Sequence, residues 1–140
     1  MMKNSIVIIG TGHAAAQLAV SLRQQKFQGE ITMIGNEPYL PYHRPPLSKA
    51  FLSNEKTIDE LMIRTPEFYH KHQINIMCHR NVVQIDRIQQ TVKLDDGQQI
   101  TYDQLAICTG ARVRKLSVEG HQLSGVFYIK TIDDVIHLKK

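Results

Sequence analysis

Apolar and polar positions follow two different periods along the first part of the chain. Residues 6–9 are a continuous apolar run, the pattern of a strand that is buried on both faces. The residues after it carry Leu18 and Leu22 at helical spacing, with small alanines on the neighbouring side, which predicts an amphipathic helix. Gly29 closes this unit, and residues 31–34 read as a second strand. The order strand, helix, strand predicts a βαβ unit.

A glycine motif lies between the first strand and the helix. Gly10 and Gly12, with Ala15 in the place of a third glycine, read G-x-G-x-x-A. Gly10 allows a tight turn, Gly12 lets a pyrophosphate approach the backbone, and Ala15 lets the helix pack closely on the strand. The helix start offers N–H groups to phosphates, and Asn36 and Glu37 follow the second strand where a ribose contact is expected. The motif predicts a dinucleotide site; the alternative is a tight turn in an ordinary α/β protein.

A proline-rich loop comes next. Residues 37–49 hold four of the five prolines, so this stretch is neither helix nor central strand but a stiffened, extended loop. Pro46 suits the first turn of a helix over residues 47–52. Arg44 and Lys49 are placed to approach a bound cofactor; the alternative is a surface loop with two solvated cations.

The rest of the chain alternates short apolar segments with turns. Thr65 and Pro66 predict the start of a helix that runs to residue 72, and Thr131 predicts the cap of another. Thr109 and Gly110 end a buried strand at an edge where ligands bind in doubly wound sheets. The expected strands are residues 74–78, 82–86, 91–94, 99–102, 105–108 and 126–129, with a hairpin turn at 95–97 and an antiparallel meander after the second helix.

Composition narrows the function classes. The 140 residues suffice for one domain with a real core; 42% are hydrophobic and 21% charged, and the net charge of +4 is too small and scattered to argue for nucleic acid. No apolar run is long enough to span a membrane, and because residues 1–5 lead directly into the first strand we expect no signal peptide. Cys78 and Cys108 are expected to be free thiols in a cytoplasmic protein, and the seven histidines follow no metal-binding spacing.

Two strings together resemble a known family. GTGHAA at residues 10–15 and RPPLSK at residues 44–49 are similar to the start of the NADH-dependent ferredoxin and rubredoxin reductases, which serve ring-hydroxylating dioxygenases and bacterial P450 systems and belong to the glutathione-reductase-like flavoproteins. The resemblance implies a Rossmann-like, three-layer FAD-binding domain, with a parallel sheet and an inserted antiparallel meander. It places an FAD-binding part over residues 1–115 and a connection toward an NADH-binding domain over residues 116–140.

The resemblance also implies which residues contact FAD. Lys49 would lie beside the flavin and tune it, Val82 would meet the adenine, and Thr109 and Gly110 would lie near the flavin. Lys130 stands where relatives have an arginine. Asn36 stands where relatives often have an acid, and because the acid here comes one residue later, Glu37 is a second candidate for the ribose contact. No catalytic acid, base, nucleophile or metal is implied. The full set of expected cofactor contacts is Gly10, Gly12, His13, Ala14, Ala15, Asn36, Glu37, Arg44, Lys49, Val82, Thr109, Gly110 and Lys130.

The implied activity is electron transfer, in which NADH reduces FAD and the flavin passes electrons to a ferredoxin or rubredoxin. The chain has no second G-x-G-x-x-G, so we expect an incomplete FAD domain without turnover of its own, whose exposed apolar surface favours homo-oligomers. One rival is a non-catalytic FAD- or NAD-binding module. Another is a disulfide reductase, but its CxxxxC chemistry is missing because residues 17–51 contain no cysteine.

Overall fold

The computed structural model describes residues 4–140. Residues 1–3, on which the expectation of no signal peptide partly depends, lie outside this range. The contacts within the chain define two compact units. The first runs up to Tyr42 and resumes over Ile63–Gly110, and the second comprises His43–Met62 and Ala111–Lys140.

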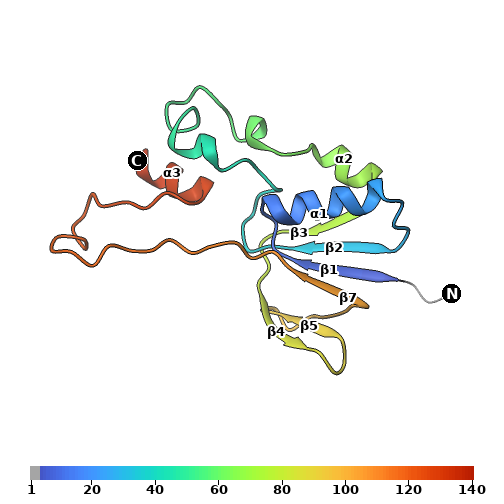
Figure 1. Cartoon of the computed structure of the whole chain (residues 1–140). Coiled ribbons are helices and arrows are strands. Elements are labelled where there is room, and N and C mark those ends of the chain that lie inside the picture. Colours follow the sequence, from blue (N-terminus) through green and yellow to red (C-terminus); the bar gives the residue numbers. More distant parts are fainter. Residues whose placement is uncertain (1–3) are drawn as a thin grey trace. The chain divides into compact units, whose positions relative to one another are not determined.

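A four-stranded parallel sheet forms the centre of the first unit (Figure 1). Its order is β3–β2–β1–β7, and every neighbouring pair is parallel. The strands are β1 (Ser5–Ile9), β2 (Glu30–Ile34), β3 (Ile74–Met77) and β7 (Gln104–Ile107). The first and last of these pair in register from Ile6 with Gln104 to Ile9 with Ile107, so their carboxyl ends meet at one edge.

The side chains of β1 and β2 alternate between two cores, because successive residues of a strand point to opposite faces. Ile6, Ile8, Ile31 and Met33 pack on one face with the alanines of α1 (His13–Gln24). Val7 and Ile34 pack on the other face with residues of the antiparallel strands. The predicted strand buried on both faces is therefore confirmed.

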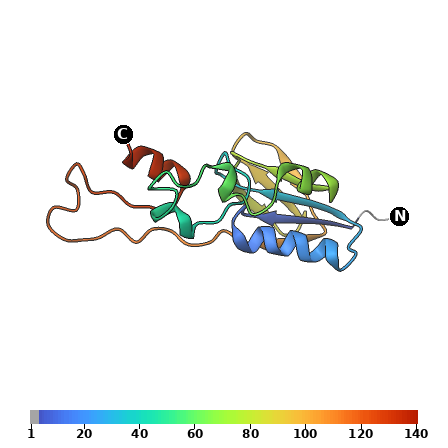
Figure 2. The ribbon, with the colours of Figure 1, turned by 90° about the horizontal axis from the view of Figure 1, so that it is seen from above.

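The second face is covered by an antiparallel sheet of β4 (Val82–Asp86), β5 (Thr91–Leu94) and β6 (Gln99–Thr101). Figure 1 shows α1 on one side of the parallel strands and β4 and β5 on the other, and Figure 2 gives the view from the α1 side. The helix α2 (Pro66–Lys71) begins at Thr65, whose hydroxyl accepts a hydrogen bond from the N–H of Phe68, as expected for a cap. The three-layer Rossmann-like class with a meander is confirmed.

The second unit consists of short elements. They are the 3₁₀ turns η1 (Pro45–Ser48) and η2 (Asp59–Leu61) and the helix α3 (Ile132–Leu138). Thr131 and Asp134 cap α3 reciprocally: the Thr131 hydroxyl accepts from the Asp134 N–H at 3.2 Å, and the Asp134 carboxylate from the Thr131 N–H at 2.8 Å. The predicted cap at Thr131 is confirmed.

Two predictions about the second unit are wrong. The helix over residues 47–52 is the 3₁₀ turn η1, which ends because Lys49 leaves helical geometry at φ −131° and ψ −114°. The strand at 126–129 does not form, although Val126 and Phe127 are apolar; both are more than 40% exposed, and no described strand pairs with them.

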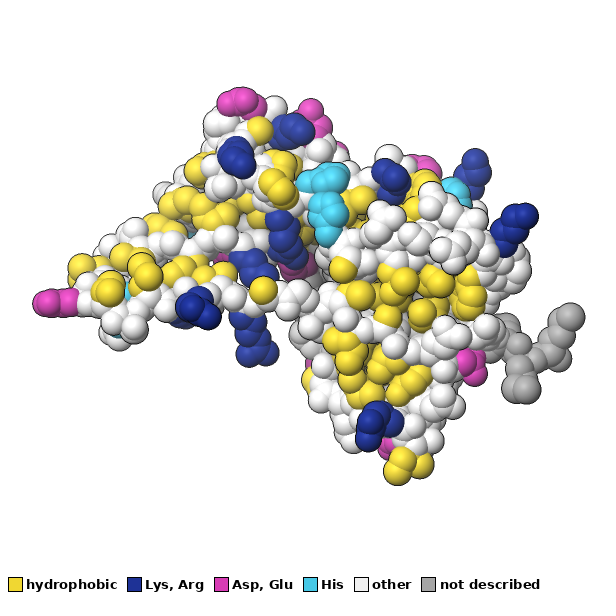
Figure 3. All heavy atoms as spheres, in the orientation of Figure 1, with side chains coloured by type: hydrophobic (Ala, Val, Ile, Leu, Met, Phe, Trp, Pro, Cys, Tyr) yellow, Lys and Arg dark blue, Asp and Glu magenta, His cyan; other side chains and the backbone are white. Residues whose placement is uncertain are grey.

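Two predictions about the first unit need correction. The strand at 74–78 belongs to the parallel sheet as β3 rather than to the meander. The strand at 105–108, predicted to be buried, is an edge strand among the described residues, and Ile107 is 64% exposed because β7 has a neighbour on one side only. Figure 3 shows hydrophobic side chains reaching the surface on the face that it draws.

Candidate dinucleotide-binding site

Gly10 lies where three strand ends meet. Its N–H donates to the Ile34 carbonyl oxygen at 2.7 Å, and the Cys108 N–H donates to the Ile9 carbonyl oxygen at 2.7 Å. Its φ of +122° is left-handed, and a Cβ built there would overlap the carbonyl of Cys108. Only glycine adopts this φ without strain and leaves room for the Cys108 carbonyl, so the predicted tight turn has a definite steric cause.

Gly12 has the opposite environment. A Cβ built on it would have no heavy atom within 4 Å, and its φ of −87° suits any residue. Packing within the chain therefore gives no reason for a glycine here. The open space above Gly12 is the kind that a ligand would occupy, because a backbone without Cβ lets a phosphate approach closely.

The start of α1 leaves room for an anion. Gly12 is its N-cap and supplies no side-chain acceptor, and the first turn contains no acidic residue. Positive dipole and N–H donors therefore remain at this end for a negative group. His13 and Ala14 are exposed here, whereas Ala15 is fully buried between α1 and the sheet and allows close packing.

The end of β2 carries Asn36 and Glu37. The Glu37 carboxylate accepts a hydrogen bond from the Tyr42 hydroxyl at 2.5 Å, and Tyr42 itself is buried. Asn36 is exposed and lines a cavity of about 310 Å³. The Tyr42 side chain of the proline-rich loop thus holds Glu37, while Asn36 borders this cavity.

The loop after β3 is attached to this strand end by backbone hydrogen bonds. The His79 N–H donates to the Glu37 carbonyl oxygen at 3.0 Å, and the Arg80 N–H to that of Gly35 at 2.9 Å. Asn81 then leads into β4, whose first residue is Val82, expected to meet the adenine. The end of β2 and the start of β4 are therefore neighbours, as a shared nucleotide site requires.

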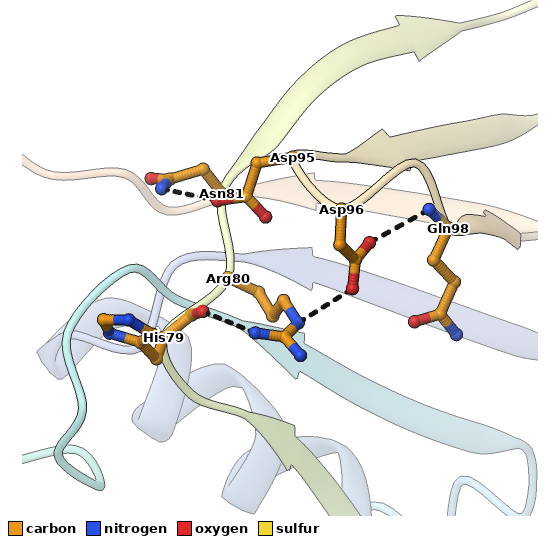
Figure 4. A network of polar contacts seen from close by, with 6 residues as sticks. All are labelled: His79, Arg80, Asn81, Asp95, Asp96 and Gln98. Atoms are coloured by element: carbon orange, nitrogen blue, oxygen red, sulfur yellow. Dashed lines mark hydrogen bonds and ion pairs between the residues drawn. The ribbon is translucent and has the colours of Figure 1, made fainter.

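Polar contacts join this loop to the turn between β5 and β6 (Figure 4). The Arg80 guanidinium pairs with the Asp96 carboxylate at 3.1 Å, and the Asn81 side-chain amide donates to Asp95 at 3.0 Å. The hydrogen bond from Asn81 is the main cause that lowers the pKa of the Asp95 carboxyl. The cavity beside Asn36 is lined by this set: His79, Arg80, Asn81, Asp95 and Asp96.

Sequence reasoning missed Arg80 and Asp96 as candidates. The Asp95-Asp96-Gly97 turn was visible in the sequence, but only as a hairpin signal. The contact between this turn and Arg80 depends on how the antiparallel sheet lies against the end of β2, and no local pattern encodes that. Thr109 and Gly110, in contrast, lie directly after β7, with the Thr109 backbone beside Gly10 as their position predicted.

The three expected cations belong to the second unit. Arg44 donates from Nη1 to the Lys130 carbonyl oxygen at 2.6 Å, and the Lys130 ammonium donates to the Ala111 carbonyl oxygen. Lys49 is exposed and follows η1. Arg44 and Lys130 are thus joined, although they are far apart in the sequence.

The residues of the first unit fit a dinucleotide pyrophosphate. Gly12 leaves space that a Cβ would fill, the helix start carries no competing acid or cap, and polar side chains border a cavity at the next strand end. A helix layer, a parallel sheet and an antiparallel sheet, with the glycine loop at the carboxyl edge of the parallel strands, define a dinucleotide-binding α/β domain.

Comparison with known proteins identifies the family. Residues 4–140 match the model of the pyridine nucleotide-disulphide oxidoreductases, and the chain belongs to this family. It is 48% identical to rhodocoxin reductase of Rhodococcus erythropolis over 91% of this chain and 30% of that protein. It is 38% identical to rubredoxin-NAD(+) reductase of Pseudomonas putida over 97% of this chain and 35% of that protein.

Solved structures agree with these relatives. The ferredoxin reductase for the CYP199A2 system of Rhodopseudomonas palustris superposes with a TM-score of 0.89 and 40% identity, over 97% of this chain and 33% of that one. The chain thus spans about a third of the length of the relatives it matches. The resemblance to ferredoxin and rubredoxin reductases is confirmed.

Residues 4–140 bring together no group of three or more His, Cys, Asp or Glu side chains suited to a metal ion. Within the same range, every helix is too short or too polar to cross a bilayer. Cys78 and Cys108 are free thiols, and burial raises the pKa of Cys78.

Proposed function

We propose that this chain is the FAD-binding part of a reductase that passes electrons from NADH to a ferredoxin or a rubredoxin. The observation that carries the proposal is the open space at Gly12 in front of an uncapped helix start, in a chain of this family. The names of the relatives supply the electron acceptor class. FAD, when bound, supplies the redox chemistry that links a two-electron donor to a one-electron acceptor.

The protein's part is to bind and to orient. Gly10, Gly12 and the first turn of α1 (His13, Ala14 and Ala15) would hold the pyrophosphate by backbone donors. Asn36 and Glu37 would receive the ribose, and the backbone at Val82 the adenine. The Tyr42 hydroxyl supports this division, because it fixes the Glu37 carboxylate at the end of β2.

The flavin end would involve Thr109 and Gly110 together with three cations, Arg44, Lys49 and Lys130. Lys49 would tune the flavin by its charge rather than transfer protons. The hydrogen bond between Arg44 and the Lys130 carbonyl supports a joint role for these two residues. Lys130 offers a compact charge in place of an arginine's planar fork, so it would contribute attraction rather than paired hydrogen bonds.

We also propose the division at residue 115, with FAD contacts before it and a connection toward an NADH-binding domain after it. The absence of regular structure over residues 111–130, within the described range, supports a connecting role for this stretch. The free thiols Cys78 and Cys108 support a cytoplasmic location.

The test is flavin binding by the purified 140-residue chain. FAD is added in excess, unbound cofactor is removed by gel filtration, and the absorbance spectrum and FAD content are measured. We expect FAD and ADP to bind, and flavin mononucleotide, which lacks adenosine and one phosphate, to bind more weakly. If neither FAD nor ADP binds in titration calorimetry, the proposal is wrong.

Turnover separates the reductase from the non-catalytic module. We expect the 140-residue chain alone to show no steady NADH oxidation with a ferredoxin, since it holds a single glycine motif of the dinucleotide type. The longer protein of the relatives' length should oxidise NADH and reduce ferredoxin. A longer protein that binds FAD without any NADH oxidation would favour the binding module.

A further inference from the structure

Arg80 lines the cavity beside Asn36, and two contacts orient its side chain. Its Nε pairs with Asp96 at 3.1 Å, and its Nη1 donates to the His79 carbonyl oxygen at 3.0 Å. Two contacts of this kind fix the plane of the guanidinium. The side chain is nevertheless 40% exposed, so the plane is held while part of its surface remains accessible.

Asp96 is itself fixed by the turn that carries it. Its second carboxylate oxygen accepts a hydrogen bond from the Gln98 N–H at 2.9 Å, and Asp95 beside it accepts from Asn81. The Asp95 N–H in turn donates to the Asn81 carbonyl oxygen at 2.9 Å. The turn of the antiparallel sheet and the loop of residues 79–81 therefore behave as one support for Arg80 (Figure 4).

The lining of this cavity suits a neutral polar ring. Arg80 and the Asn36 and Asn81 amides offer donors, while Asp95 and Asp96 offer acceptors, so an additional anion would meet two carboxylates. Adenine has both kinds of hydrogen-bonding group on its edge and a flat face, on which a guanidinium stacks well. The volume of about 310 Å³ is at the lower end of the range for small-molecule pockets, roughly 300–1,000 Å³.

We propose that Arg80, oriented by Asp96, stacks on the adenine of the bound dinucleotide, and that the β5–β6 turn forms one wall of the nucleotide site. The inference rests on the proposed function, because the dinucleotide is the ligand whose ribose would lie at Asn36. It adds a binding side chain from the loop before Val82 and gives the antiparallel sheet a part in recognition.

The experiment is titration calorimetry of the 140-residue chain with two probes, ADP and inorganic pyrophosphate. Arg80→Ala should weaken ADP binding about tenfold, because one base-stacking contact is lost. It should leave pyrophosphate binding unchanged, because pyrophosphate has no base. Arg80→Lys should also lose ADP affinity, because it keeps the charge and loses the plane. Arg87→Ala is the matched control, an exposed arginine in the turn that follows β4.

The outcomes are distinguishable. ADP affinity that is unchanged in Arg80→Ala, or fully kept in Arg80→Lys, overturns the stacking role and leaves the proposed function standing. An equal loss of affinity for ADP and for pyrophosphate in Arg80→Ala also overturns the stacking role, since Arg80 would then act through the fold rather than on the base. A wild-type chain that binds neither probe overturns this inference together with the proposed function. The melting temperature of each variant, followed by circular dichroism, should stay at the wild-type value.

Discussion

The substitution Gly12→Ala tests whether Gly12 is needed for ligand binding rather than for folding. The added methyl group meets no protein atom within 4 Å, and the backbone at φ −87° accepts alanine. Alanine is a poorer N-cap than glycine by up to about 1 kcal/mol, and it stabilises by about 0.4–1 kcal/mol through the unfolded chain. These terms nearly cancel, so we expect the melting temperature to change by no more than about 4 °C.

Binding should respond quite differently. If a phosphate occupies the space above Gly12 as proposed, a methyl group there costs about 1–3 kcal/mol, as overpacking does in a well-packed site, and lowers ADP affinity about 5- to 150-fold. Gly10→Ala is the contrast: it combines a left-handed φ with overlap of the Cys108 carbonyl, and should unfold the first unit. Calorimetric titration with ADP, alongside thermal unfolding, measures both. A Gly12→Ala chain that binds ADP as tightly as wild type would refute the reasoning.

Three further changes test other parts of the structure. Arg44→Ala removes the hydrogen bond to the Lys130 carbonyl and should lower the free energy of unfolding by about 1–2 kcal/mol in urea titrations, whereas the exposed Arg112 should tolerate alanine within about 0.5 kcal/mol. Burial raises the pKa of Asp134, but two backbone N–H donors lower it more. Its folded pKa is therefore below the ordinary 3.8, and its stabilisation is complete above that pH and lost as the pH falls through the folded value. Asp134→Asn should thus cost about 0.5–1 kcal/mol at pH 7 and less as the pH falls below 3.8, and a loss that does not shrink with falling pH would contradict the cap. We expect the wild-type chain to self-associate and Ile107→Lys to weaken that association in sedimentation velocity, because Ile107 is apolar and 64% exposed on an edge strand. A wild-type monomer at high concentration would disprove self-association.

The βαβ unit could be predicted from the sequence because its pattern is local. The apolar run of β1, the glycines and the helical spacing after them each identify an element, and their order fixes the parallel pairing. The Thr65 and Thr131 caps were predictable for the same reason, since a cap involves residues only three positions apart.

Predictions that depended on distant neighbours were less successful. Residues 105–108 have the apolar pattern of a central strand, but burial is set by whether another strand lies alongside, and β7 has one on a single side among the described residues. Val126 and Phe127 have strand propensity without a partner. The Arg80–Asp96 pair joins two turns that come together only through the tertiary fold.

The steric contact between Gly10 and Cys108 has a consequence for the order of folding. The glycine loop becomes complete only when β7 pairs with β1, and Ser5 and Asp103, which hydrogen-bond across that pairing, are 98 residues apart. At about 5–20 residues per second, the ribosome needs roughly 5–20 s to make the intervening chain. During that interval β1 has an unpaired edge next to a glycine loop that lacks one wall. If this loop holds FAD as proposed, its binding surface is completed only after synthesis of β7, and until then β2 and α1 cover the apolar residues of β1.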